Sequence, residues 1–137
     1  MTPLALFDEI DLERPAEATL RPGLERRDEF VAEDRLLTDV GGSLDVAVLS
    51  TPGMIGAMER NSALLAYAHL PLGRATVGFE VCVKHVAAAG RGARLSVRST
   101  LREVVEGRKL RYEVEVAEGE RTIGFGTHER RVVEVGR

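Results

Sequence analysis

The fold is decided by the stretch STPGMIGAMERNSALLAYAHL, residues 50–70. Thr51 followed by Pro52 suits the cap and first turn of a helix, and the proline and glycine that follow residue 70 suit its end. Apolar residues recur every three or four positions between these ends, and only residues 59–61 interrupt a nearly all-apolar surface. We therefore predict a long helix that is buried on most sides.

The sequence after this helix alternates between apolar and polar residues. Four runs show the alternation, at 75–86, 95–102, 110–116 and from 123 onward. In the first run, the residues predicted to face the core are Val77, Phe79, Val81 and Val83. Glycine-containing turns separate the runs, and a weaker run at 26–33 predicts a first strand. This pattern is typical of an antiparallel meander with one face against the core.

A long apolar helix and four long strands must bury each other. We predict an α+β domain in which a curved antiparallel sheet of about five strands wraps a long central helix, the hotdog architecture. Cone-shaped α+β folds of the cystatin-like group have the same ingredients, but a helix that precedes uninterrupted strands favours the hotdog fold. We assign residues 23–137 to this domain and residues 1–22 to a flexible N-terminal arm. Exposed sheet edges predict a homodimer.

Composition narrows the classes of function. The chain has 137 residues, 44% hydrophobic and 30% charged, which suits one ordinary domain. A single cysteine excludes a disulfide scaffold, and the three histidines lack metal-ligand spacing, so we expect no metal and no cofactor. No apolar run is long enough to cross a membrane. The N-terminus lacks the basic start of a secretory signal, so we expect a cytoplasmic protein.

Charge is unevenly distributed along the chain. Residues 1–39 hold 11 acids and 5 bases, whereas residues 40–137 hold 11 acids and 14 bases. The mildly basic remainder favours an anionic small-molecule ligand. The bases are not clustered and are not interleaved with aromatic residues, so we expect no nucleic-acid partner.

Four residues stand out chemically, and three of them have two interpretations. Glu59 interrupts an apolar helix, where a carboxylate that loses water becomes a better base or nucleophile, but it also fits an exposed polar stripe. His85 lies near a strand end, where sites often form, or it is merely a solvated strand residue. The Thr51 hydroxyl caps the helix or donates a hydrogen bond to an oxyanion. Cys82 is predicted to be a small core or sheet residue.

Four motifs, in this order, resemble those of the fluoroacetyl-CoA thioesterase family of hotdog proteins. They are TPGMIGAME at 51–59, GFEVCVKH at 78–85, GRKL at 107–110 and GTHERR at 126–131. The resemblance extends from about residue 46 to residue 135. The ordered set is more specific than any one of its pieces.

The resemblance implies a catalytic Thr51, Glu59 and His85, with Gly78 and Arg130 contacting the substrate. It implies that the glutamate attacks the thioester carbonyl or activates water, assisted by the other two, and that CoA binds near the dimer interface. Residues 39–49 contain no aromatic residue, where the family's namesake carries an aromatic-rich lid. We therefore predict the reaction class, hydrolysis of a small acyl-CoA, and leave the acyl group open.

Geometry sets one condition on this site. If residues 51–59 form one regular helix, Thr51 and Glu59 are about 12 Å apart along its axis. Thr51 must then belong to the preceding loop, or the site must be shared between protomers. The alternative function is a non-catalytic hotdog module that binds acyl-CoA. A hotdog enoyl-CoA hydratase has less support, because such enzymes have a closely spaced Asp–His pair that is absent from this sequence.

Overall fold

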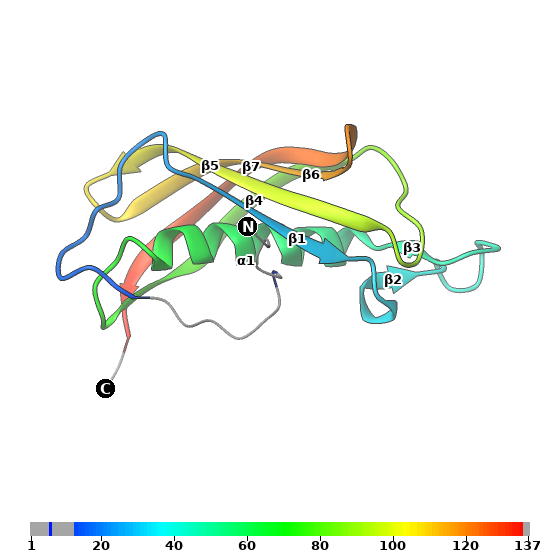
Figure 1. The fold of residues 1–137 in the computed structure, drawn as a ribbon, viewed down its shortest axis with the longest axis horizontal. Coiled ribbons are helices and arrows are strands. Elements are labelled where there is room, and N and C mark those ends of the chain that lie inside the picture. The colour runs from blue at the N-terminus through cyan, green and yellow to red at the C-terminus, as the bar shows by residue number, and fades with distance from the viewer. Residues whose placement is uncertain (1–5, 7–12, 136–137) are drawn as a thin grey trace.

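The structure is a computed structural model that describes Leu6 and residues 13–135. A single long helix lies against an antiparallel five-stranded sheet of order β1-β5-β6-β7-β4 (Figure 1). The helix is α1 (Thr51–Tyr67), and the strands of the sheet are β1 (Glu25–Val31), β4 (Arg74–His85), β5 (Arg94–Val105), β6 (Lys109–Glu118) and β7 (Arg121–Glu134). The predicted α+β architecture is confirmed.

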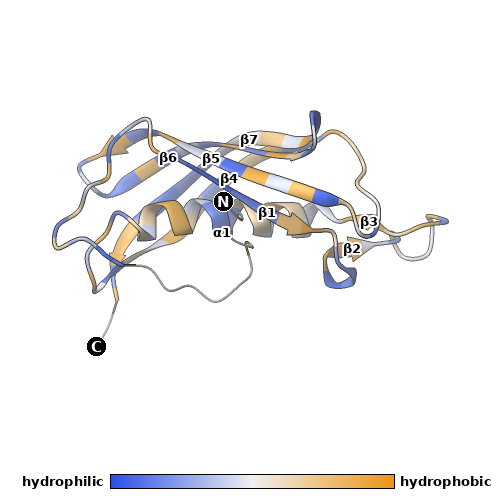
Figure 2. Ribbon diagram, viewed as in Figure 1, coloured by the Kyte–Doolittle hydropathy of each residue, from blue (hydrophilic) through white to orange (hydrophobic). Residues whose placement is uncertain are grey.

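The core lies between α1 and the sheet. Met54, Ala57 and Met58 on the helix are fully buried, as are alternate residues of β5 and β6. Figure 2 shows the helix as an apolar element with one hydrophilic patch in its middle, and it shows the colour alternating along β5. Periods of 3.6 and 2 thus place one apolar surface of each element at the same interface.

A small second sheet precedes the helix. It pairs β2 (Leu37–Thr38) with β3 (Val48–Leu49), and a single 3₁₀ turn, η1 (Asp34–Leu36), leads into it. The sequence predicts a loop here, because strands of two residues are too short to show alternation. This sheet holds the chain beside the start of α1, where the Ser50 amide donates to the Leu36 carbonyl.

The predicted inward face of β4 is wrong in its first half. A β-bulge between Gly78 and Glu80 inserts Phe79 as an extra residue, which reverses the alternation. Val77 and Phe79 are therefore exposed, at 50% and 60%, whereas Val83 packs against the core. Cys82 is also exposed, so of the two predicted alternatives it is a sheet residue and not a core residue.

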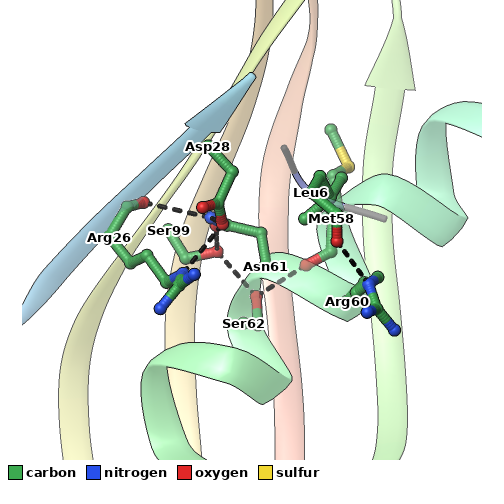
Figure 3. Close-up of polar contacts among 8 residues, drawn as sticks. All are labelled: Leu6, Arg26, Asp28, Met58, Arg60, Asn61, Ser62 and Ser99. Carbon is green, nitrogen blue, oxygen red and sulfur yellow. Dashed lines mark hydrogen bonds and ion pairs between the residues drawn. The ribbon is translucent and has the colours of Figure 1, made fainter. Parts of the chain in front are cut away.

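A buried polar cluster fixes α1 against β1 and β5 (Figure 3). The Asp28 carboxylate accepts hydrogen bonds from Arg26 and from the Asn61 side chain, both at 2.8 Å. The side-chain oxygen of Asn61, Oδ1, accepts a hydrogen bond from the Ser99 hydroxyl. This hydroxyl also lies 2.7 Å from the hydroxyl of Ser62. Asn61 is fully buried, so it does not belong to an exposed stripe beside Glu59.

The predicted N-terminal arm lies partly outside the described residues. Its described part contacts the end of the helix, where Arg14 donates to the carbonyls of Leu70 and Pro71 and its guanidinium lies 3.6 Å from the centre of the Tyr67 ring. Across Leu6 and residues 13–135, no helix is long and apolar enough to cross a membrane. The same residues contain no cluster of three His, Cys, Asp or Glu side chains that suits a metal ion.

Candidate active site

Thr51 and His85 are brought together at one end of the helix. Thr51 is the first residue of α1 and His85 is the last residue of β4, and the Thr51 Oγ1 lies 2.9 Å from the His85 Nδ1. The helix cap is Ser50, whose side chain accepts from the Gly53 amide. The prediction that Thr51 caps the helix is therefore wrong, and its hydroxyl pairs with the imidazole instead.

A hollow of about 380 Å³ lies beside this pair. Its walls come from the small second sheet and from the segment after β4, including Val40, Val48 and Ala88. Val40 has a positive φ of 53°, a backbone conformation that β-branched residues rarely adopt. Because most of these lining residues are apolar, the Thr51–His85 pair opens onto a concave and mostly apolar surface.

Glu59 lies over β4, next to Gly78 and Arg130. A Cβ atom at position 78 would lie 2.9 Å from the Glu59 Oε2, so glycine leaves room for the carboxylate. The Arg130 Nη1 is 3.8 Å from the same oxygen. The Glu59 side chain remains 43% exposed, whereas that of Arg130 is only 8% exposed. The apolar helix predicts a buried carboxylate, but within one chain the Glu59 carboxylate is only partly buried.

Arg130 is held in place by residues of two strands. Its Nε donates to the Thr76 hydroxyl at 2.8 Å and its Nη2 to the Thr76 carbonyl at 3.0 Å. Its Nη1 lies 3.2 Å from the His128 Nε2. Burial lowers the pKa of Arg130 from its ordinary value, and the nearby Tyr112 and Glu59 partly offset this. These contacts orient the guanidinium toward Glu59.

His128 is a part of this arrangement that the sequence analysis did not identify. Burial lowers its pKa, and the positive charge of Arg130 adds to this effect, so the ring is neutral near pH 7. Its Nδ1 lies 2.7 Å from the Glu80 carbonyl, which is a pure acceptor. The Nδ1 therefore donates there, and the Nε2 accepts from Arg130. The Tyr112 ring stacks on the imidazole, with centroids 6.1 Å apart.

Within one subunit, the predicted site residues lie in two separate groups. Thr51 and His85 form the first group, and Glu59, Gly78 and Arg130 form the second. Because Thr51 and Glu59 belong to the same regular helix, the eight steps between them span about 12 Å. The alternative in which Thr51 belongs to the preceding loop is therefore wrong. Within one subunit, the Thr51 hydroxyl and the Glu59 carboxylate do not share a hydrogen bond.

The two groups offer complementary chemistry. The Glu59 carboxylate is a base or nucleophile that lies next to a fixed cation. The Thr51–His85 pair can donate hydrogen bonds to a developing negative charge. Together they contain a nucleophile or base and a hydrogen-bond donor, the parts that acyl transfer uses.

Comparison with solved structures establishes the class of this fold. The chain matches a hot-dog-like protein from Thermanaerovibrio acidaminovorans with a TM-score of 0.74 and 23% identity, over 83% of this chain and 84% of that one. The protein therefore has the hotdog fold, as its sequence predicts.

The family is equally clear. Residues 31–136 match the fluoroacetyl-CoA-specific thioesterase family, and the chain belongs to this family. It is 38% identical over 86 residues to the fluoroacetyl-CoA thioesterase of Streptantibioticus cattleyicolor. That alignment covers 63% of this chain and 61% of the relative.

A solved structure of the fluoroacetyl-CoA thioesterase FlK superposes with a TM-score of 0.76 at 30% identity, covering 84% of this chain and 89% of that one. A single-residue variant of FlK, in complex with fluoroacetate and CoA, superposes equally well, over 85% of this chain and 97% of that one.

Proposed function

We propose that this protein is an acyl-CoA thioesterase whose active site forms between two subunits. The observation that carries the proposal is the position of the two groups of site residues on one helix and one strand. Glu59 is partly exposed over Gly78, and the Thr51–His85 pair lies at the other end of the same stretch of β4. Membership of a thioesterase family supports the reaction class.

The edge of the sheet supports a homodimer. β4 is a terminal strand of 12 residues, and long terminal strands with exposed apolar side chains tend to pair. Val77, Phe79 and Val81 are 50%, 60% and 36% exposed on this strand. Two copies of β4 can pair antiparallel about a two-fold axis, which joins the sheets of the two subunits into one continuous sheet.

The position of the two-fold axis follows from the site. Residues opposite each other in an antiparallel pair point to the same face. With the axis at Cys82, Val81 lies opposite the partner's Val83. Because the partner's Phe79 is bulged, His85 then lies opposite the partner's Gly78. Glu59 of the partner subunit lies over that glycine, so this arrangement brings the carboxylate to the Thr51–His85 pair.

The proposed reaction uses each group once. The Glu59 carboxylate attacks the thioester carbonyl carbon, or it takes a proton from a water molecule that attacks the same carbon. The Thr51–His85 pair donates a hydrogen bond to the oxyanion that forms, from the hydroxyl or from the imidazole Nε2 according to which of the two donates in the bond between them. The carbon–sulfur bond then breaks, and CoA leaves as a thiolate that takes up a proton released by water. In the covalent route, water then hydrolyses the mixed anhydride on Glu59, which releases the acyl group as a carboxylic acid and regenerates the carboxylate. The Arg130 guanidinium, whose Nη1 lies 3.8 Å from the Glu59 Oε2, orients the carboxylate.

Thiol release from a panel of acyl-CoA thioesters tests the reaction class. We expect turnover above the buffer rate with at least one short or medium acyl group. The thioesterase proposal fails if every thioester gives only the buffer rate. Calorimetric binding of acyl-CoA without turnover would instead identify a non-catalytic binding module.

A mixed dimer tests the shared site. Glu59→Gln and His85→Ala chains, carrying different tags and purified as heterodimers, contain one intact and one doubly altered site. We expect about half the wild-type kcat per dimer from the heterodimer. Each variant alone is expected to have almost no activity. A heterodimer as inactive as its parents would show that the three catalytic residues do not combine across subunits.

A further inference from the structure

A groove that includes Glu59 runs along one side of α1. It has a volume of about 430 Å³, within the range of small-molecule sites. Its lining residues follow helical spacing along one side of the helix, with one arginine from β7. They are Gly56, Glu59, Arg60, Ala63, Leu64, Tyr67 and Arg130.

Small side chains make this side of the helix concave. A Cβ atom at Gly56 would have no other atom within 4 Å, and Ala63 adds only one methyl group. Leu64 is 5% exposed and gives the groove an apolar floor. Arg60 lies at the rim, where its Nε donates to the backbone carbonyl of Leu6. The groove thus extends from the Glu59 carboxylate along the second half of α1.

Tyr67 lines the end of the groove farthest along α1 from Glu59. Its ring is covered by the Arg14 guanidinium at 3.6 Å, and Arg14 is itself anchored to the backbone carbonyls of Leu70, Pro71 and Arg74. Eight residues separate Glu59 from Tyr67, which is about 12 Å along the helix. An extended alkyl chain advances about 1.25 Å per carbon, so a span of about 12 Å matches a chain of up to about ten carbons.

We infer that this groove receives the acyl chain of the substrate and that the protein prefers medium-length, unbranched acyl groups to two-carbon ones. The inference rests on the proposed thioesterase function, because Glu59 must contact the carbonyl carbon at the mouth of the groove. An acyl chain that starts there and follows α1 contacts Ala63 and Leu64. Burial of its methylene groups against these apolar side chains favours binding of longer chains.

Chain-length profiles of variants test this inference. We expect the wild type to have a higher kcat/KM for octanoyl-CoA than for acetyl-CoA. Ala63→Leu blocks the groove in its middle, so the ratio of these two kcat/KM values is expected to fall at least about tenfold. Tyr67→Ala opens the far end and is expected to move the optimum to longer chains.

Ala117→Leu is the matched control, because it adds the same side chain on β6, outside both the groove and the hollow beside Thr51 and His85. We expect it to leave the octanoyl-to-acetyl ratio unchanged. The inference is overturned if the wild type prefers acetyl-CoA, if Ala63→Leu leaves the ratio unchanged, or if Ala117→Leu lowers it as much as Ala63→Leu does. Failure of the proposed function has a different result, since no acyl-CoA of any length is then hydrolysed.

Discussion

Replacing Glu59 with glutamine is expected to lower kcat for acyl-CoA hydrolysis about 10²–10⁴-fold. The amide has the same shape as the carboxylate, but it can neither attack the thioester nor accept a proton from water. The fold should remain intact, because Glu59 is 43% exposed and Arg130 keeps its hydrogen bonds to Thr76 and His128. Steady-state thiol release measures the loss, and thermal unfolding verifies the fold.

Glu118→Gln provides the matched control for this substitution. Glu118 lies at the end of β6, where it pairs with Arg121 on the surface, and it is not one of the proposed site residues. We expect kcat to be unchanged. If Glu59→Gln retained more than half of the wild-type kcat, the carboxylate would have no part in the chemical step.

Replacing Asn61 with alanine is expected to lower the free energy of unfolding by about 2–4 kcal/mol. The change removes the amide that donates to the buried Asp28 carboxylate at 2.8 Å, and it also removes the acceptor for Ser99 (Figure 3). Asp28 is 2% exposed, so water does not readily replace the lost donor. Urea denaturation measures the effect as a lower midpoint.

Arg102→Ala is the control for the stability measurement. Arg102 pairs with Glu113 at 2.7 Å, but both side chains are more than half exposed. Exposed ion pairs contribute little, so we expect a loss of less than about 1 kcal/mol. Equal losses in the Asn61 and Arg102 variants would contradict the role assigned to the buried cluster.

Elements that follow a regular period could be predicted from the sequence, and irregular ones could not. The alternation in residues 95–102 and 110–116 corresponds to β5 and β6, and the apolar stretch at 50–70 contains α1. In β4, the same reasoning placed Val77 and Phe79 on the wrong face. One bulged residue reverses the phase, and a period-two pattern does not indicate where a bulge lies.

The site residues show a similar division. Glu59 is conspicuous because it interrupts an apolar helix, whereas His128 and Thr76 become visible only through strand pairing. The register that pairs Gly78 with Arg130 brings Thr76 to the guanidinium, and no spacing along the chain encodes that contact. Serine, threonine and proline occupy positions 50–52, and either hydroxyl residue can cap the helix. Only the structure identifies Ser50 as the cap.

The distance between Thr51 and Glu59 on α1 also affects how activity depends on protein abundance. If the reacting groups come from different chains, a solitary chain is inert. The rate of hydrolysis then follows the fraction of chains that are in dimers. This fraction falls with dilution when the protein concentration is near the dissociation constant of the dimer. Halving synthesis in that range would more than halve hydrolysis, so a shared site makes thioester turnover fall more steeply than protein abundance.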